Sequence, residues 1–314
     1  MQIPQNVVNW LLEEENPSIC YRTMKELLDM PETDPRVQRA KKKIPSYSPV
    51  KKMLDAMHPD GYWEEINPRT KEKIGDGTIY FRNTTHFILA YLAELGMTRE
   101  NPTIEKAVNR YLSLQQPNGD FYRQFSCLYA MNIRTFVLLG FRDDERVKNT
   151  IRLMRESIRY DNGYLCDMHE GKHKKGRLVK SCIRGSAKVL FAVSELPDLW
   201  EEPLSKKVVD YFLDRNVLYK STDKSSLVNR DAGQTIFPFT WRFGLLDILL
   251  PLSKMGYIKE PRMQSAWDFL ENHKNQKDQY ILDIDIKCKY WKVGKRGESN
   301  KWVTFYAYLC LKYK

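Results

Sequence analysis

Two of the six cysteines and two of the five histidines of this chain fall in one segment, residues 161–197. Cys166, His169 and His173 lie in a polar loop of that segment, and Cys182 begins the apolar stretch that follows. Thiolate sulfur and imidazole nitrogen are ligands that zinc prefers, and a zinc site needs three or four of them. The spacing therefore makes this segment a candidate metal site.

Cys127 has the same local context as Cys182. Each cysteine follows a serine at the beginning of an apolar stretch, and an Asn-Gly-aromatic turn precedes both stretches. Equivalent positions of neighbouring repeats lie side by side in repeat proteins, so we expect these two cysteines to be neighbours. The alternative is that both are small buried helix residues and that the histidines lie on a solvated basic loop. The predicted zinc ligands are Cys127, Cys166, Cys182, His169 and His173.

Aromatic side chains form a second group of candidates, at or near the beginnings of the apolar stretches. If they gather at one end of a helical bundle, they line an apolar pocket with a capacity for cation–π contacts. His86 has the same kind of position and is a candidate acid–base residue. The alternative for each of these side chains is ordinary core packing. The predicted substrate-binding residues of this group are Tyr80, Tyr129, Trp241 and Trp302.

Asp283 and Asp285 form an Asp-x-Asp pair in the last polar loop. Positioned carboxyl groups can carry general acid–base chemistry, and we therefore include both residues as catalytic candidates. The alternative is a pair of loop carboxylates exposed to solvent.

Arginines interrupt three otherwise apolar stretches, at Arg134, Arg184 and Arg242. A buried guanidinium group needs a carboxylate partner. These arginines therefore either pair internally, with Asp247 or Glu195, or bind an anionic substrate, and Arg242 is the predicted substrate-binding member.

The helices that position these residues are visible in the hydrophobic pattern. Amphipathic stretches with one apolar stripe alternate with stretches that are apolar all round, and a helix that is hydrophobic on all sides is buried. This alternation predicts an all-α fold, a single α/α toroid domain over residues 1–314 with six inner and about six outer helices. The inner helices are expected to begin near Tyr21, Thr85, Cys127, Cys182, Phe239 and Trp302.

The loops that lead into the inner helices are long, and the alternation places all of them at one end of the ring. Long loops without secondary structure are often functional, so we expect the site at that end. These loops comprise residues 62–82, 164–180, 219–236 and 281–299.

The composition argues against several classes of protein. Its hydrophobic content of 42% and charged content of 29% are typical of a globular fold. No stretch approaches the ~20 apolar residues of a membrane span, and we expect no signal peptide because no basic segment precedes the first apolar stretch. Scattered cysteines then predict reduced thiols and a cytoplasmic location. The net charge of +11 is spread among acidic residues, so we expect a solvated basic surface and no nucleic-acid partner.

The stretch SLQQPNGDF contains Gln115, Gly119 and Phe121 in the spacing Q-x-x-x-G-x-F. This is the repeat of squalene and oxidosqualene cyclases, and DGYW at residues 60–63 is a second, partial copy. Together with NPSICYRTMKELL, FPFTWRFGLLDIL and KWVTFYAYLCLK, it makes the whole chain similar to the squalene-cyclase-like, prenyltransferase-like proteins of bacteria and archaea.

The resemblance implies an α/α toroid of the kind shared by terpene cyclases, protein prenyltransferases and lanthionine cyclases. The last two classes hold zinc at the end of the toroid where the inner helices begin. The sequence departs from the terpene cyclases at their central Asp-x-Asp-Asp, because the nearest match, residues 283–286, lacks the last acid.

From the sequence we predict a transferase, cyclase or lyase that acts on a small or isoprenoid-like apolar molecule near a thiolate-bound zinc. Two alternatives stay open. One is a metal-free, carbohydrate-active α/α-barrel enzyme, and the other is a non-catalytic toroid that binds a ligand or partner.

Overall fold

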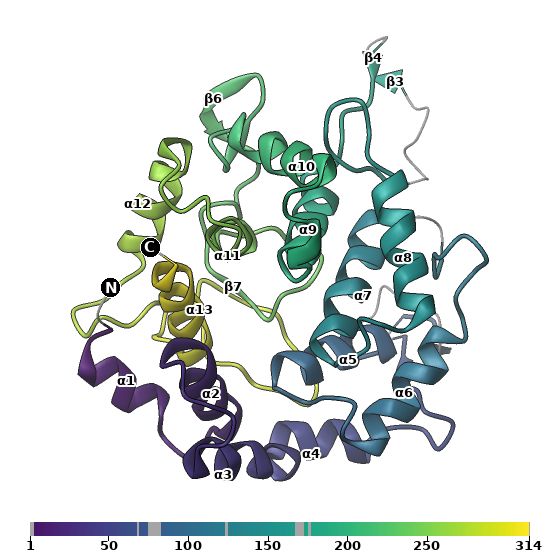
Figure 1. Cartoon of the computed structure of the whole chain (residues 1–314), viewed down its shortest axis with the longest axis vertical. Helices are drawn as coiled ribbons and strands as arrows, with labels where there is room; N and C mark the ends of the chain where they lie inside the picture. Colours follow the sequence, from purple (N-terminus) through teal and green to yellow (C-terminus); the bar gives the residue numbers. More distant parts are fainter. Residues whose placement is uncertain are drawn as a thin grey trace.

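The computed structural model describes residues 3–67, 69–74, 83–122, 125–166, 173–174 and 177–313. In these ranges the helices form an inner ring surrounded by an outer ring (Figure 1). The inner helices are α2 (Pro17–Arg22) with its π-helical continuation η1 (Thr23–Leu27), α5 (Thr85–Glu94), α7 (Ser126–Leu138), α9 (Ile183–Ser194), α11 (Leu246–Lys254) and α13 (Lys301–Lys312). The outer helices are α1 (Gln5–Leu11), α3 (Pro35–Lys43), α4 (Ser48–Asp55), α6 (Pro102–Leu112), α8 (Glu145–Glu156), α10 (Pro203–Leu213) and α12 (Gln264–Asn272). The predicted all-α toroid is confirmed.

Burial separates the two rings as the hydrophobic pattern predicts. Every residue of α5, from Thr85 to Glu94, is buried, whereas α8 buries a single stripe that includes Val147 and Met154. Consecutive inner helices pack on one another from α5 through α7, α9 and α11 to α13, and α13 packs on η1. Short 3₁₀ turns connect some of the helices: η2 (Ile44–Ser46), η4 (Pro197–Leu199) and η5 (Pro261–Met263). In the described ranges, none of the helices has the length and apolar character to cross a membrane.

The Q-x-x-x-G-x-F motif joins the end of α6 to α8. The Gln115 side-chain amide donates to the Arg146 carbonyl at 2.6 Å and to the Thr150 hydroxyl at 2.8 Å. Gly119 adopts a φ of +91°, and a Cβ atom there would lie 2.6 Å from the Asn149 carbonyl oxygen. The motif therefore holds two outer helices together, and the glycine is required both by its backbone conformation and by the space available.

A second repeated contact ties the aromatic turns to the inner helices. After the turn, the backbone N–H of an aromatic residue donates to a serine or threonine hydroxyl in the first turn of the next inner helix. The pairs in the described ranges are Trp63 with Thr85 (2.9 Å), Tyr164 with Ser186 (2.9 Å) and Tyr280 with Thr304 (2.8 Å). The turns therefore keep their structural role although their sequences differ.

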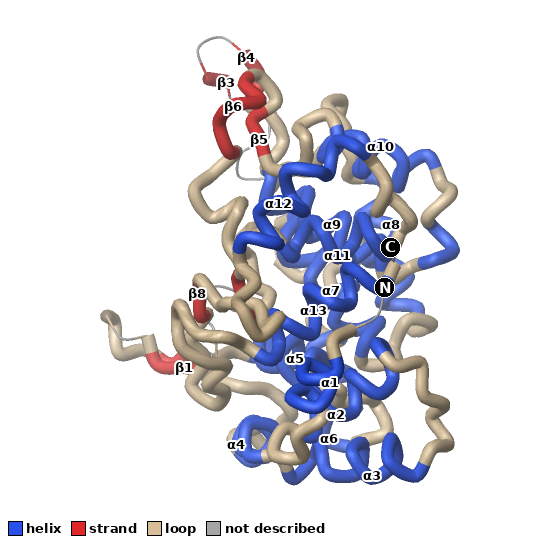
Figure 2. The backbone as a smooth tube through the Cα atoms, turned by 90° about the vertical axis from the view of Figure 1, so that its left-hand side faces the viewer, coloured by secondary structure: helices blue, strands red, loops and turns tan. Residues whose placement is uncertain are grey.

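Short strands occur in the long loops, where the sequence analysis predicted none. Three antiparallel pairs and one parallel pair are seen in the described residues: β1 (Glu65–Ile66) with β2 (Lys73–Ile74), β3 (His173–Lys174) with β4 (Arg177–Leu178), β5 (Tyr219–Lys220) with β6 (Asp223–Leu227), and, in parallel, β7 (Ile236–Phe237) with β8 (Ile284–Asp285). In Figure 2 the labelled strands lie toward one side of the helical ring. Most of these strands have two residues, which is too short for an alternating pattern to be recognised.

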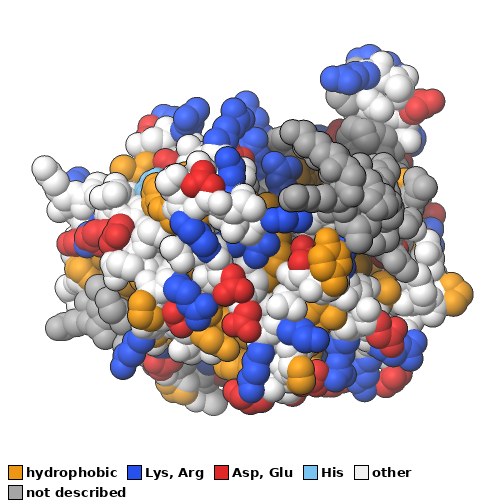
Figure 3. Space-filling view, turned by 90° about the horizontal axis from the view of Figure 1, so that it is seen from above, with side chains coloured by type: hydrophobic (Ala, Val, Ile, Leu, Met, Phe, Trp, Pro, Cys, Tyr) orange, Lys and Arg blue, Asp and Glu red, His pale blue; other side chains and the backbone are white. Residues whose placement is uncertain are grey.

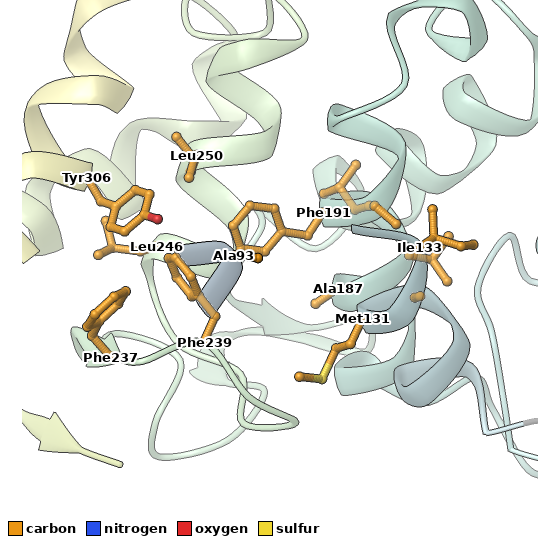
Figure 4. Packing of buried hydrophobic residues seen from close by; sticks show 14 of the residues in the cluster. Ala93, Met131, Ile133, Ala187, Phe191, Phe237, Phe239, Leu246, Leu250 and Tyr306 are labelled. Carbon is orange, nitrogen blue, oxygen red and sulfur yellow. The ribbon is translucent and has the colours of Figure 1, made fainter. Parts of the chain in front are cut away.

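The prediction of an inner helix beginning near Phe239 is wrong. Helix α11 begins at Leu246, and the preceding residues 237–243 are not helical. Phe237 and Phe239 lie among the buried hydrophobic residues of the core (Figure 4). Phe239 lies between Phe191 and Tyr306, with ring centroids 4.9 Å from each. Aromatic residues recur there at every second position, 237, 239, 241 and 243, which is the period of an extended chain and not of a helix.

A polar cluster lies inside the ring at the end opposite the short strands. The inner helices contribute charged or hydroxyl side chains to it, from the middle of the helix to the residue directly after its end, and Glu26 of η1 binds Arg22 at its edge. The members in the described ranges are Arg22, Glu94, Arg134, Glu195, Lys254 and Tyr306. Burial would raise the pKa of Glu94, but the guanidinium groups of Arg134 and Arg22 outweigh it and hold that pKa below its ordinary value. We name this set the polar cluster.

Arg134 pairs internally, as the sequence analysis allowed. Its guanidinium bonds to Glu94 and lies 3.6 Å from Glu195. Asp247, the other partner that was considered, forms a buried pair with Lys188 instead.

Candidate functional site

A wide basin opens between two loops that carry β7 and β8. Its volume is about 700 Å³. Arginine and lysine side chains line it at positions 230, 242, 287, 295 and 296, and aspartates line it at positions 231, 283 and 285. In the part of the wall that the structure describes, basic residues therefore outnumber acidic ones. We call this hollow the basin.

Asp283, directly before β8, and Asp285, on β8, both line the basin, as does Ile284 between them. Asp283 is bound on both sides: His273 Nε2 lies 2.6 Å from its Oδ2, and the Thr235 backbone N–H donates to the same atom at 2.9 Å. Burial would raise the pKa of Asp283, but the hydrogen bond from His273 outweighs it and lowers that pKa. At His273, burial would lower the pKa, but the hydrogen bond to Asp283 outweighs burial and raises that pKa. The pair is therefore an ion pair that holds β8 in place.

Asp231 and Arg242 face each other across another part of the wall. The Asp231 carboxylate lies 3.7 Å from Arg242 and 3.4 Å from Arg230. Arg242 is only partly buried, so its guanidinium remains accessible from the basin. The Asp231 carboxylate therefore attracts two arginines at ion-pair distance, and positive charge remains available to a ligand.

A smaller, mainly apolar pocket lies where the inner helices α5, α7 and α9 begin. Its volume is about 200 Å³, and the predicted site residues in its wall are His86, Trp241, Cys127 and Cys182. Phe87 and Met131 supply apolar surface beside them. The structure thus brings together two cysteines one repeat apart, a histidine and a tryptophan from four segments of the chain.

His86 is a buried, neutral imidazole. Burial lowers its pKa to about 4, and only the hydrogen bond to Asn132 opposes this change. The Asn132 amide nitrogen donates to the Tyr111 hydroxyl, so the Asn132 oxygen faces His86 Nδ1 at 2.8 Å and accepts a hydrogen bond from the Nδ1–H group. Nε2 therefore carries the lone pair, and His86 is suited to accept a proton but not to act as a cation.

The third cysteine, Cys166, lies against the beginning of α7. The Ser126 hydroxyl oxygen lies 4.0 Å from the Cys166 sulfur. The groups that act on the pKa of Cys166 are the Cys127 thiol, this hydroxyl, and the backbone N–H groups of Ser126 and Cys127. Against the effect of burial, these groups lower the pKa of Cys166 to about 6. The interaction with Cys166, together with burial, raises the pKa of Cys127.

These cysteines do not by themselves form a zinc site. Among the residues that the structure describes, no three Cys, His, Asp or Glu side chains are arranged to hold one metal ion. His169 lies outside the described residues, and only the backbone of His173 is described, in β3. Zinc binding therefore stays a prediction of the sequence, and we derive no chemical step from it.

Other predicted residues have different positions from those expected. Tyr129 and Trp302 are buried in the core and are not part of the described walls of the basin or the apolar pocket. Trp302 stacks on Phe237, with ring centroids 5.3 Å apart. Tyr80 lies outside the described residues. Tyr129 and Trp302 therefore pack in the core, which is the alternative given above for every aromatic candidate.

Most of the basic wall of the basin was not predicted from the sequence. Lys287, Lys295 and Arg296 follow Asp283 and Asp285 in the stretch DIDIKCKYWKVGKRGE. The local density of basic residues after the Asp-x-Asp pair was a usable signal. Arg230 belongs to a different loop, and no local pattern links it to that stretch.

Charged side chains elsewhere on the surface are mixed in sign. On the face shown in Figure 3, lysine and arginine side chains lie among aspartate and glutamate side chains. The basin wall, with five basic and three acidic residues, has an excess of the same sign as the whole chain, whose net charge is +11.

Solved structures resemble this chain over almost its whole length. A polysaccharide lyase superposes with a TM-score of 0.51 at 11% identity, covering 98% of this chain and 88% of its own. A family 88 glycosyl hydrolase from Bacteroides vulgatus gives 0.50 at 12% identity and covers 98% and 97%. The fold is an α/α toroid. The type II terpene cyclase MstE from Scytonema gives only 0.33 at 9% identity, with 87% and 97% covered, and supports no argument.

At such low identities the likeness establishes the fold alone. No family model matches the sequence, and no curated protein matches it.

Proposed function

We propose that this toroid is an enzyme that binds an acidic carbohydrate in the basin and cleaves it. The observation that carries the proposal is the excess of arginine and lysine over aspartate in the basin wall. Basic groups that converge on one hollow attract carboxylate groups, and arginine can hold a carboxylate through two parallel hydrogen bonds. The basin volume of about 700 Å³ also lies within the roughly 300–1,000 Å³ of typical ligand sites.

An apolar, isoprenoid-like substrate has less support. The apolar pocket, at about 200 Å³, is smaller than the roughly 300 Å³ at the lower end of that range. Protonation of an alkene also requires a carboxylic acid that carries a proton. Asp283 is bound as a carboxylate by His273 and Thr235, so it is not suited to that role.

The proposed roles follow from the contacts of each side chain. Arg242 and Lys295 bind the carboxylate of the substrate, and Asp231 positions Arg242. Asp285 transfers the proton that cleavage of a glycosidic bond requires. Asp283 and His273 hold β8, and with it Asp285, in position. Two structures that superpose with TM-scores of 0.51 and 0.50 are, by their names, a polysaccharide lyase and a glycosyl hydrolase, which supports a carbohydrate as the substrate.

The test is a comparison of acidic and neutral polysaccharides as substrates. Polygalacturonate, alginate and hyaluronan would be incubated with the protein beside starch and a neutral β-glucan. New reducing ends report any cleavage, and ultraviolet absorbance of a new carbon–carbon double bond distinguishes elimination from hydrolysis. We expect cleavage of at least one acidic polymer and none of the neutral ones.

Two variants locate the reaction in the basin. Asp285→Asn should abolish cleavage and preserve binding, whereas Lys224→Ala, which removes an exposed lysine of the neighbouring β6 from outside the basin wall, should change neither. Cleavage of neutral polymers at the same rate would contradict the proposed substrate class. Binding of acidic polymers without any cleavage would contradict the enzymatic role and favour a carbohydrate-binding toroid.

A further inference from the structure

A groove lies between the inner helix α2, its continuation η1 and the outer helix α3, which pack side by side (Figure 1). Its volume is about 250 Å³. None of its described wall residues also lines the basin or the apolar pocket. Most of its wall is apolar and consists of Leu12, Pro17, Cys20, Met24, Leu28, Met30 and Ala40. We call this hollow the N-terminal groove.

The floor of the N-terminal groove belongs to a small hydrophobic cluster that is separate from the main core. Cys20, Met24 and Ala40 are buried members of this cluster. Leu28, also in the wall, is 36% exposed, although it is a large hydrophobic side chain. Covering such surface with an apolar group removes it from water, which is favourable. The groove therefore offers a ligand an apolar surface.

The charged side chains of the wall leave one positive charge without a partner. Arg36 is paired with Asp34 at 3.0 Å, and Lys43 is paired with Glu14 at 2.6 Å. Arg39 shares their face of α3, because the three basic positions are spaced by three and four residues. It is exposed, and no hydrogen bond or ion pair joins it to another residue in the described ranges.

We propose that the N-terminal groove binds a medium-chain aliphatic carboxylate such as octanoate. The carboxylate lies on Arg39, and the chain covers Met24 and Leu28. An arginine can hold a carboxylate through two parallel hydrogen bonds, and one unpaired positive charge matches a ligand with one negative charge. Because no described groove residue lines the basin, this site is independent of the proposed carbohydrate cleavage.

The size of the groove indicates the length of the chain. Its volume of about 250 Å³ corresponds to about eight groups of the size of a water molecule, at roughly 30 Å³ each. It is also smaller than the roughly 300 Å³ at the lower end of sites for drug-sized ligands. Both comparisons favour a single unbranched chain over a larger ligand.

The experiment titrates octanoate into the intact protein labelled with ¹³C at its methionine methyl groups, whose signals are assigned with methionine-to-leucine variants. The signals of Met24 and Met30 should shift and saturate with one equivalent bound, whereas that of Met154, buried on α8, should not shift. Hexanoate should bind about tenfold more weakly, because each methylene removed from water strengthens binding about fourfold. Octyltrimethylammonium and 1-octanol, which lack the negative charge, should bind at least about fivefold more weakly than octanoate.

Two matched charge reversals locate the carboxylate. Arg39→Glu should weaken octanoate binding about tenfold and strengthen the binding of octyltrimethylammonium. Lys42→Glu, on the same helix but outside the described wall, should change the affinity for octanoate by less than about twofold. Both side chains are exposed, so we expect both variants to fold, which circular dichroism verifies. The comparison of octanoate with 1-octanol needs no variant.

Equal affinities for octanoate and 1-octanol, or an unchanged affinity in Arg39→Glu, would overturn the proposal. Saturation of other methionine signals before those of Met24 and Met30 would do the same. Tighter binding of acetyl-Leu-Leu-Leu, which also has one carboxylate, would show that the groove takes a peptide instead. Shifts of the same signals with protein concentration alone would show that a second copy of the chain occupies it.

Discussion

The Arg22 guanidinium lies 2.5 Å from the Tyr306 hydroxyl, although 284 residues separate them in the chain. This contact joins the first inner helix to the last. Glu94 accepts hydrogen bonds from both residues, so the three side chains close the ring through one buried group. A buried polar network of this kind stabilises a fold only while its members are satisfied.

Removing the Tyr306 hydroxyl should therefore weaken the whole ring. Tyr306→Phe leaves Arg22 and Glu94 without one hydrogen-bond partner, and we expect a loss of about 1–3 kcal/mol in the free energy of unfolding. Urea denaturation followed by circular dichroism measures it. Tyr308→Phe is the control, because the Tyr308 hydroxyl donates to the Asp278 carbonyl in a partly buried site outside the polar cluster. Equal losses from the two variants would show that the polar cluster has no special role.

The His273–Asp283 pair should make stability depend on pH. The raised pKa of His273 gives a stabilisation that is complete below its ordinary value of 6.5 and is lost as the pH rises through the higher folded-state value. The lowered pKa of Asp283 gives a second stabilisation, which is complete above its ordinary pKa of 3.8. This stabilisation is lost as the pH falls through the lower pKa that Asp283 has in the folded protein. The pair should therefore contribute most between these two values.

A double-mutant cycle with His273→Gln and Asp283→Asn tests this dependence. We expect a coupling energy of about 1 kcal/mol near pH 5 that falls toward zero near pH 9. The same cycle on His58 and Asp60, an exposed pair 3.4 Å apart, should give almost no coupling at either pH. A coupling between His273 and Asp283 that is larger at the alkaline pH would contradict the assignment of an ion pair.

The glycine of the Q-x-x-x-G-x-F motif is expected to be intolerant of any side chain. Gly119→Ala places a Cβ atom against the Asn149 carbonyl and also imposes a positive φ on alanine. Gly256 has nearly the same φ, +88°, but nothing lies within 4 Å of a Cβ atom there. Gly256→Ala should cost only the ~1–2 kcal/mol of the backbone conformation, and Gly119→Ala should cost clearly more. Similar melting temperatures for the two variants would mean that the helices shift without strain.

The two tryptophans that the sequence assigns to a substrate site should differ in their effect on stability. Trp302→Ala empties a core position and should cost about 3–5 kcal/mol, because this side chain is only 2% exposed. Trp241→Ala removes a partly exposed wall of the apolar pocket and should cost less. Denaturant unfolding of both variants measures the difference, and equal costs would place Trp241 in the core.

The rings of helices were predictable because all-apolar and amphipathic helices alternate, as α5 and α8 show. The placement of Cys127 and Cys182 in the wall of one pocket was predictable in part, because the two cysteines begin equivalent helices. The polar cluster was not, since Arg22, Glu94 and Tyr306 are distant in sequence and each stands in an otherwise apolar stretch. The segment around Phe239 was misassigned because hydrophobic content was considered without its period of two.

The basin could not be predicted from the sequence for a different reason. Its wall combines Arg230 and Arg242 from one loop with Asp283, Asp285 and the lysines and arginine that follow from another. The parallel pairing of β7 with β8 brings these loops together, with Ile236 opposite Ile284. No local pattern indicates a two-residue parallel pairing between segments so far apart, so the charge excess became visible only in the structure.

The most direct test of the account is a binding measurement on the basin itself. An oligogalacturonate and its methyl-esterified form, in which a methyl group on each carboxyl removes the negative charge, would be titrated calorimetrically into the wild-type protein and into Lys295→Glu. The account predicts binding of the acidic form alone, with affinity reduced about tenfold or more in the variant. Equal affinity for the esterified form, or binding of the acidic form that Lys295→Glu leaves unchanged, would contradict the claim that the basin recognises an acidic carbohydrate by its charge.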